Sequence, residues 1–366
     1  MNNPRTPQPK SWICNPSLLR PDWTTGAVRN PDLLWLDKNE NLDPQFTASN
    51  QIIVKNAVKK YLNIYPDSAM LYQKLGLWVG VSPKNLILTP GSDGAIKVVF
   101  EAFIQENDVV LHTSPTFAMY AVYCKIYGAQ AITLEYAKSA TGPKLEIEAL
   151  LEAIKNHRPR LICLPNPDSP TGNYFGLSEM REIIETASLV GAIILVDEAY
   201  HPFYDVTVAG LVNTYPNLIV ARSFAKAWGL AGLRIGYAVA GTDVTEYLHK
   251  IRPMYEVNSV AVAAIVQTLG KANLMQDSVN RLEAGKQFFI KEMRELGFQT
   301  LSGKGNFLHV AFAEKAPVIH SELSNIVLYR KDFNEPCLAG FSRFSSTTVE
   351  LFKPIVDRIK HVKTHI

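Results

Sequence analysis

The fold is indicated most clearly by the segment Ser223-Phe224-Ala225-Lys226-Ala227-Trp228-Gly229-Leu230-Ala231-Gly232-Leu233-Arg234-Ile235-Gly236-Tyr237. It follows an apolar run at 218–221 that is typical of a buried strand. An ammonium group is costly to bury unless it finds a partner or loses its proton. Lys226 is therefore a candidate amine nucleophile. Ser223 and Arg234 are a hydroxyl donor and a fixed cation, the two groups that suit a phosphate.

Ser223 and Lys226 also have the Ser-x-x-Lys spacing of serine acyl-enzymes. Those enzymes need a Lys-Thr-Gly and a Ser-Asp-Asn elsewhere, and neither tripeptide occurs in this sequence. A solvated loop lysine is a third interpretation, because so short a motif arises by chance. The rest of the chain has to decide between these interpretations.

The composition of the 366 residues is that of an ordinary globular protein, with 47% hydrophobic and 19% charged residues. A net charge of +3 is too small to indicate nucleic acid or a membrane surface as a partner. No apolar run approaches the roughly 20 residues of a membrane helix, and the polar start Met1–Arg5 does not resemble a signal peptide. The cysteines are scattered, so we expect a reducing cytoplasm and neither disulfides nor a metal site: Cys14, Cys124, Cys163 and Cys337.

Five short apolar runs, each ending in a polar or glycine-rich motif, occur at 85–89, 108–112, 160–164, 191–196 and 217–222. Helical patterns lie between them, and 233–240 resembles one more strand. Strand, motif and helix in repetition predict a doubly wound α/β fold with ligands at the carboxyl ends of the strands. From about 245 the pattern changes. We therefore predict an N-terminal arm with part of a small domain (1–45), a large domain (46–248) and a small α/β domain (249–366).

Two of the motifs carry groups that suit a charged ligand. Ser92 and Asp93 open a helical pattern after the first run, where free N–H groups attract an anion, although helix capping needs the same residues. Asp197 ends the most apolar run, and a buried carboxylate there needs a cationic partner. That partner is either a structural salt bridge or the protonated ring nitrogen of a cofactor.

The order of these motifs resembles that of the fold type I pyridoxal-phosphate (PLP) aminotransferases, in particular the histidinol-phosphate aminotransferase-like group. The resemblance covers nearly the whole chain from about residue 33. Asp197 and Tyr200 match the family's Asp-x-x-Tyr, and Pro170-Thr171-Gly172 matches its Asn-Pro-Thr-Gly, with Ser169 in place of the asparagine. Asn39-Glu40-Asn41 is similar to its Asn-Glu-Asn segment, where Leu42-Asp43 replaces the usual Pro-Tyr.

The resemblance implies PLP as the cofactor and a homodimer with shared active sites. Lys226 would hold PLP as a Schiff base and then move the proton between substrate and cofactor. Asp197 would pair with the ring nitrogen, Tyr200 and Ser169 would lie near the phenolic oxygen, and Phe117 would stack on the ring. The expected phosphate contacts are Ser92, Asp93, Ser223, Arg234 and, from the neighbouring subunit, Tyr65. Glu198 and His201 are expected to be structural.

Two arginines in the C-terminal part are candidate substrate contacts. Phe341–Ser345, followed by Thr347, Thr348 and Glu350, resembles the family segment whose arginine binds a substrate carboxylate or phosphate, so Arg343 is the expected anchor and Arg330 a second contact. The expected reaction moves an amino group from an amino acid, glutamate by preference, to a small oxo acceptor that is phosphorylated in the resembled group. The nearest alternative is a PLP-dependent decarboxylase of threonine- or serine-phosphate type. A PLP-binding regulator would need a DNA-binding domain, for which about 30 N-terminal residues are too few.

Overall fold

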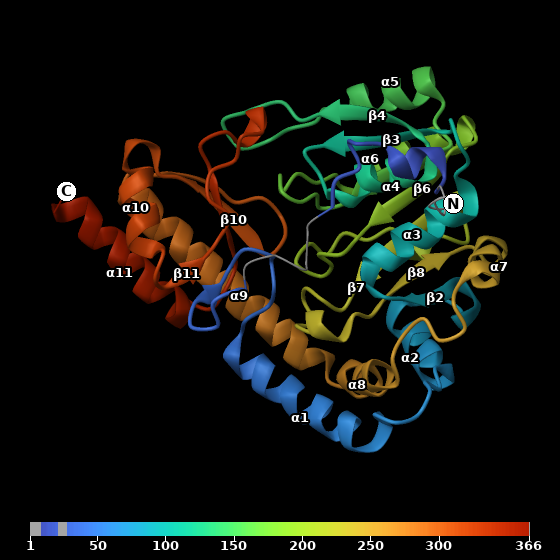
Figure 1. Ribbon diagram of the computed structural model, residues 1–366, viewed down its shortest axis with the longest axis horizontal. Helices are drawn as coiled ribbons and strands as arrows, with labels where there is room; N and C mark the ends of the chain where they lie inside the picture. Colours follow the sequence, from blue (N-terminus) through green and yellow to red (C-terminus); the bar gives the residue numbers. More distant parts are fainter. Residues whose placement is uncertain (1–8, 21–27, 366) are drawn as a thin grey trace, which may run out of the picture.

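The computed structural model describes residues 9–20 and 28–365 of the chain (Figure 1). Within these residues the largest element is a seven-stranded sheet with the order β2-β8-β7-β6-β5-β3-β4. Its strands are β2 (Leu86–Thr89), β3 (Val109–Ser114), β4 (Gln130–Glu135), β5 (Leu161–Pro165), β6 (Ile193–Asp197), β7 (Leu218–Ser223) and β8 (Gly236–Ala240). The predicted α/β fold with a mostly parallel sheet is confirmed.

The five predicted runs correspond to β2, β3, β5, β6 and β7. All residues of β2 and β5 are buried, as expected for strands covered on both faces. β4 was not predicted. In the described part of the chain it pairs with β3 alone, at the edge of the sheet, and of its residues Ile132 and Leu134 are partly buried while the others are exposed. Its mixed composition, Gln-Ala-Ile-Thr-Leu-Glu, lacks the continuous apolar run that revealed the other strands.

The strand predicted at 233–240 begins later, at Gly236, and runs antiparallel to both of its neighbours. Ala231–Leu233 form a 3-10 turn, and Arg234 adopts a left-handed conformation with φ 51°, so neither can extend the strand. Because β8 runs in the opposite direction, its first residue lies at the edge where the parallel strands end. This direction brings Arg234 to that edge.

Helices cover both faces of the sheet and make a three-layer architecture (Figure 1). One face packs mainly against α3 (Gly91–Phe103), α4 (Met119–Tyr127) and α7 (Thr242–Ile251). The other packs against α1 (Pro44–Tyr61), α2 (Ala69–Val79), α5 (Ile147–His157), α6 (Leu177–Leu189) and α8 (Ser259–Leu269). Alternate strand residues supply the two cores, as in β7, where Ile219 faces one and Val220 the other.

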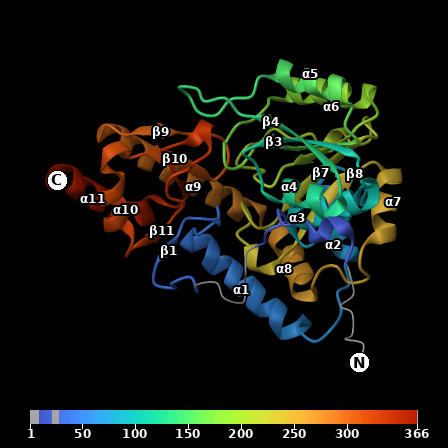
Figure 2. The same cartoon turned by 45° about the horizontal axis from the view of Figure 1, so that its top comes forward.

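A second, smaller unit lies to one side of the large sheet (Figure 2). In the described part of the chain it holds a three-stranded sheet of order β12-β10-β9 and a parallel pair of β1 and β11. Its elements are β1 (Leu34–Trp35), α9 (Ala272–Glu295), β9 (Gln299–Leu301), β10 (Phe307–Ala311), α10 (Ala316–Leu323), β11 (Val327–Leu328), β12 (Ser342–Ser345) and α11 (Val349–His365). Leu36 belongs to its core although it lies far away in sequence.

The proposed division of the chain at residues 45 and 248 stays a prediction. Residues of α8 and of the start of α9 pack into a core of the large sheet, for example Ile265 and Val279. Residues 9–20 lie against α4, where Lys125 Nζ donates to the Ser17 carbonyl at 2.8 Å. The prediction made for Met1–Arg5 falls outside the described residues. Among those described, no helix combines the length and the apolar character needed to cross a bilayer.

Short 3-10 turns complete the described structure: η1 (Ser11–Cys14), η2 (Pro83–Asn85), η3 (Ala209–Leu211), η4 (Ala231–Leu233), η5 (Ala313–Lys315) and η6 (Pro336–Leu338).

Candidate active site

Strand register brings the predicted motifs to one edge of the large sheet. Asp197 pairs with Pro165 on one side and with Ala221 on the other. Two residues further along, Ser223 pairs with Gly236, which in turn pairs with Thr89. Residues far apart in sequence are therefore neighbours because the carboxyl ends of parallel strands meet at one edge.

The end of β2 brings together several groups that suit an anion. Gly91 adopts φ 80°, and a Cβ atom there would lie 2.9 Å from Arg234 Nη2, so a side chain at Gly91 would displace the guanidinium. Arg234 Nη2 donates to the Pro90 carbonyl at 3.3 Å. Ser92 and Asp93 lie in the first turn of α3, whose free N–H groups favour an anion. Ser223 ends β7, and its strand partner Gly236 also pairs with Thr89 at the end of β2, so the four predicted phosphate contacts of this subunit lie at the same edge of the sheet.

Asp197 is a buried carboxylate with no cationic partner among the described residues. Its Oδ2 accepts a hydrogen bond from the Tyr120 hydroxyl at 3.2 Å, and its Oδ1 accepts one from the Ala199 N–H at 3.0 Å. No ion pair involves Asp197 within residues 9–20 and 28–365. Burial raises the pKa of this carboxyl to about 7, against the opposing effect of the two hydrogen bonds. The site therefore favours a ligand that supplies positive charge.

Lys226 lies on the loop after β7 and is only partly buried. Its Nζ donates to the Lys38 carbonyl at 2.7 Å and lies 5.7 Å from the centre of the Tyr200 ring. The apolar neighbours Phe224 and Trp228 face the core. The inference that apolar sequence buries the ammonium is therefore wrong: these residues anchor the loop, and the amine stays accessible.

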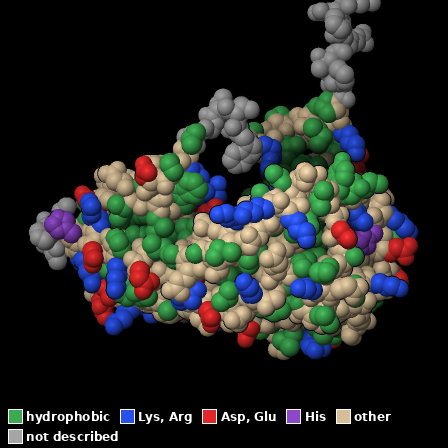
Figure 3. All heavy atoms as spheres, turned by 90° about the horizontal axis from the view of Figure 1, so that it is seen from below, with side chains coloured by type: hydrophobic (Ala, Val, Ile, Leu, Met, Phe, Trp, Pro, Cys, Tyr) green, Lys and Arg blue, Asp and Glu red, His purple; other side chains and the backbone are tan. Residues whose placement is uncertain are grey.

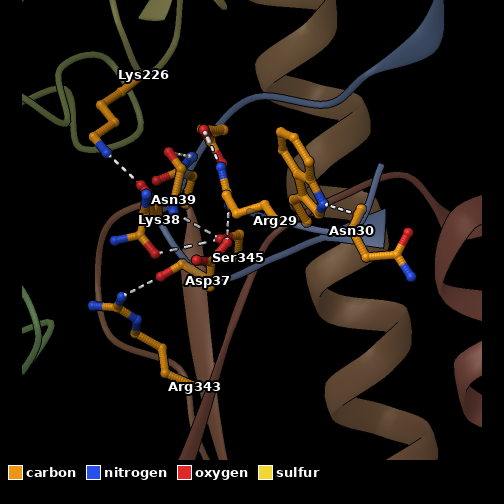
Figure 4. Close-up of polar contacts among 11 residues, drawn as sticks. Arg29, Asn30, Asp37, Lys38, Asn39, Lys226, Arg343 and Ser345 are labelled. Atoms are coloured by element: carbon orange, nitrogen blue, oxygen red, sulfur yellow. Dashed lines mark hydrogen bonds and ion pairs between the residues drawn. The ribbon is translucent and has the colours of Figure 1, made fainter. Parts of the chain in front are cut away.

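The segment Asp37-Lys38-Asn39 belongs to the site, although no site role was predicted for it from the sequence (Figure 4). Its first two carbonyls accept hydrogen bonds from the two cations, Asp37 from Arg343 at 2.8 Å and Lys38 from Lys226 at 2.7 Å. The Asn39 Nδ2 donates to the Tyr200 hydroxyl at 2.8 Å. The resemblance to Asn-Glu-Asn was the available signal, but backbone acceptors leave no side-chain pattern in a sequence.

Arg343 is a buried guanidinium that contacts neutral acceptors. Besides the Asp37 carbonyl, it donates from Nη1 to the Ser169 hydroxyl at 3.3 Å, while its buried Nε has no hydrogen-bond partner within residues 9–20 and 28–365. Burial lowers the pKa of Arg343. Arg330 differs, because its side chain is about half exposed and pairs with Glu335 at 3.0 Å. The two arginines are cross-strand neighbours, but only Arg343 lacks a carboxylate among the described residues.

Two predicted residues lie at the surface of the site. The Phe117 side chain is 38% exposed, and its ring packs edge-on against Tyr120, which bonds Asp197. Tyr65 is 75% exposed and stacks on Tyr255 with ring centres 4.3 Å apart. Tyr65 lines a shallow pocket together with Arg234.

Asp168, the residue before Ser169, is part of the site although no sequence motif singled it out. It is fully buried and accepts hydrogen bonds of 2.7 Å from the hydroxyls of Thr113, Thr116 and Tyr136. Burial raises its pKa to about 7. These three donors fix the loop that carries Ser169. No local pattern reveals them, because two lie at or just after the end of β3 and the third follows β4, all far from Asp168 in sequence.

Glu198 has the structural role that was expected. It forms a buried ion pair of 2.8 Å with Arg222, so strands β6 and β7 are tied together just where Asp197 and Ser223 leave the sheet.

Comparison with known proteins decides the family. The model of the family "Aminotransferase class I and II" matches residues 31–359. The chain belongs to this family. A histidinol-phosphate aminotransferase from Thermoanaerobacter pseudethanolicus is 32% identical to this aminotransferase over 333 residues, which are 89% of this chain and 92% of the relative.

Solved structures share the fold of this aminotransferase. The histidinol-phosphate aminotransferase of Sinorhizobium meliloti, in complex with pyridoxal-5'-phosphate, has a TM-score of 0.79 at 22% identity, covering 90% of this chain and 91% of that one. The L-threonine-O-3-phosphate decarboxylase of Porphyromonas gingivalis has a TM-score of 0.74 at 19% identity, covering 90% and 99%. At these identities the likeness concerns the fold alone, and this fold is shared by a protein named as an aminotransferase and one named as a decarboxylase.

The cofactor of this aminotransferase is pyridoxal 5'-phosphate, and the residues present fit it. In the part of the chain that the structure describes, Asp197 has no ion pair, and a protonated ring nitrogen would supply the missing positive charge. Arg234 and the start of α3, beside the end of β2, supply a guanidinium and free N–H groups that suit its phosphate. Lys226 presents an accessible amine on the loop that follows β7.

Proposed function

We propose that this aminotransferase takes its amino group from glutamate and passes it to a small phosphorylated oxo compound. The observation that supports glutamate as the donor is the buried Arg343 guanidinium. Among the described residues its acceptors are all neutral, and its Nε has no acceptor. A desolvated guanidinium without a counter-ion favours a carboxylate that can accept two parallel hydrogen bonds. The phosphorylated acceptor is supported by the names of the relatives.

The proposed cofactor contacts divide by chemistry. Ser92, Asp93, Ser223 and Arg234 would hold the phosphate, through the N–H groups of α3, a hydroxyl and a guanidinium. Phe117 would cover one face of the ring with an exposed aromatic side chain. Ser169 and Tyr200 would lie beside the phenolic oxygen, where Ser169 is shorter than the family's asparagine.

The proposed catalytic roles follow from accessible protons and charges. When bound, PLP supplies a carbonyl that takes up the amino group and a ring that withdraws electrons from the reacting carbon. Lys226 would hold it covalently, and its Nζ, once freed, would carry the proton. Asp197 would keep the ring nitrogen charged, and Tyr200 would orient its hydroxyl through Asn39.

We also propose a homodimer in the cytoplasm. Tyr65 lies among exposed apolar side chains beside the proposed phosphate site, including Leu62, Ile64 and Met254. The face that carries α1 shows further hydrophobic side chains between charged ones (Figure 3). Such surface favours association, and a partner there would place its Tyr65 near a phosphate. Cytoplasmic location is supported by four free cysteines, of which three are buried.

Glutamate added alone to the PLP-loaded protein tests this proposal. We expect conversion of the cofactor to its pyridoxamine form with one equivalent of 2-oxoglutarate. Arg343→Lys should weaken glutamate binding strongly, because an ammonium cannot form the paired hydrogen bonds. Arg330→Lys is the matched control and should have a smaller effect, because Arg330 already pairs with Glu335. Release of carbon dioxide from a phosphorylated amino acid, without a pyridoxamine form from any donor, would support the decarboxylase instead.

A further inference from the structure

Asp37 contacts two arginines, Arg343 through its backbone carbonyl and Arg29 through its carboxylate. Its backbone carbonyl accepts a hydrogen bond from Arg343 Nη2 at 2.8 Å, whereas its carboxylate forms an ion pair with Arg29 (Figure 4). Both Asp37 acceptors belong to one residue, so the carboxylate is held within a few bond lengths of the Arg343 guanidinium. It nevertheless makes no ion pair with Arg343 in the described structure.

Arg29 is well placed to keep the carboxylate there. Its guanidinium also bonds both oxygens of Glu40, at 3.4 and 3.3 Å, and stacks on the Trp35 ring at 4.0 Å. The Trp35 Nε1 in turn donates to the Asn30 carbonyl at 2.8 Å, so the ring is fixed. The Arg29 side chain is 22% exposed, which reduces the screening of these charges by water.

We propose that Arg29 is a positioning residue that withholds the Asp37 carboxylate from Arg343 and so keeps Arg343 available to the carboxylate of the substrate. This inference rests on the proposed role of Arg343 as substrate anchor. A carboxylate tethered this closely has an effective concentration of about millimolar or above. Once released from Arg29, it would therefore compete for the same two N–H groups.

Two other roles for this cluster predict different behaviour. If Asp37 served as a counter-ion that assists Arg343, removing its carboxylate would weaken ligand binding. If Arg29 merely supported the shape of residues 37–40, its loss would weaken binding whether or not Asp37 kept its charge. Competition alone predicts that removing the Asp37 carboxylate repairs the loss of Arg29.

The test measures binding of glutarate, a dicarboxylate without an amino group, to the PLP-loaded protein by calorimetry. Arg29→Gln should raise the dissociation constant about 10- to 100-fold, the ratio for one charge-assisted hydrogen-bonded pair that must first be broken. Asp37→Asn should bind at least as tightly as the native chain. Arg29→Gln with Asp37→Asn should return to within about twofold of native. Arg29→Gln with Glu40→Gln, the matched control, should stay weak.

Steady-state kinetics with glutamate give a second readout. Because competition for Arg343 weakens the ground state and transition state alike, Arg29→Gln should raise KM and leave kcat nearly unchanged. Arg29→Lys, which keeps the charge, should lie between the native chain and Arg29→Gln. Native circular dichroism and PLP absorbance would establish that each variant is folded and loaded.

The outcomes separate this inference from the proposed function. Three results would each overturn the role of Arg29. Glutarate binding could be unchanged in Arg29→Gln, or it could stay weak in the double variant with Asp37→Asn. It could also be weaker in Asp37→Asn alone. If Arg343→Lys leaves glutarate binding unchanged in the otherwise native chain, the anchor itself is misassigned and both proposals fail. Weak binding in Arg343→Lys with no effect of Arg29→Gln refutes only the inference about Arg29.

Discussion

Replacing Asp197 by asparagine should raise the free energy of unfolding when PLP is absent and lower it when PLP is bound. The carboxyl is 5% exposed, has no cation among the described residues, and burial raises its pKa from 3.8 to about 7. A raised pKa means that the folded state binds a proton that the unfolded state releases. Stability from this group is therefore complete below pH 3.8 and is lost as the pH rises towards about 7.

The size of the effect follows from that window. Each pKa unit corresponds to about 1.4 kcal/mol, so the cost of the ionised carboxylate approaches about 4 kcal/mol at pH values above its folded pKa. Asparagine never ionises, and its amide can still accept from the Ala199 N–H and donate to the Tyr120 oxygen. Asp197→Asn should therefore gain up to about 4 kcal/mol in the free energy of unfolding at about pH 8, and almost nothing at about pH 4.

Bound PLP should reverse the order of the two proteins. A protonated ring nitrogen gives the native carboxylate its missing cation, whereas an amide gains little from it. PLP should then stabilise the native chain more than the variant, and turnover of the variant should fall by roughly 10²–10³-fold.

Urea unfolding followed by circular dichroism, between about pH 4 and pH 8 and with or without PLP, measures these differences. Asp277→Asn, which removes an exposed carboxylate on α9, is the matched control and should show no dependence on PLP. An Asp197→Asn chain that is less stable than native at every pH, and that PLP stabilises as much as the native chain, would refute the reasoning.

Three further predictions concern the lysine, the dimer and the contact between the two units. Borohydride reduction of the PLP-loaded protein and peptide mapping should place the label on Lys226; a label on another lysine would contradict the assignment. Mixing Lys226→Ala with Tyr65→Phe chains should give hybrid dimers in which one site regains both the native lysine and the native tyrosine. Because Tyr65→Phe removes about 1–3 kcal/mol of hydrogen bonding, the gain in activity should be clearest at low PLP. A fully active monomer would exclude the shared site. Gly303→Ala should lower the free energy of unfolding by about 1–3 kcal/mol, since its Cβ would lie 2.6 Å from the Gly172 Cα. Gly297→Ala is the control for backbone strain alone, because Gly297 lies in open space but at φ 81°.

Much of the large sheet could be predicted from the sequence because buried parallel strands are apolar on both faces. β6 is the clearest case, and Asp197 could be singled out as a carboxylate at the end of such a strand. β4 could not be predicted, because an edge strand needs apolar residues on one side only. Lys226 was identified by its motif, but whether its amine is buried or accessible depends on the packing of Phe224 and Trp228.

The tertiary structure alone decided which groups act on one another across the chain. Lys226 contacts a carbonyl 188 residues away, and Arg343 contacts the preceding carbonyl at a separation of 306 residues. Backbone acceptors are identical in every residue, so no sequence pattern marks them. Arg343 and Arg330 resemble each other in sequence. They differ because Arg330 pairs with Glu335, whereas Arg343 bonds the backbone carbonyl of Asp37, whose carboxylate pairs with Arg29. A residue's type determines the charge that it carries, but the fold determines whether that charge already has a partner.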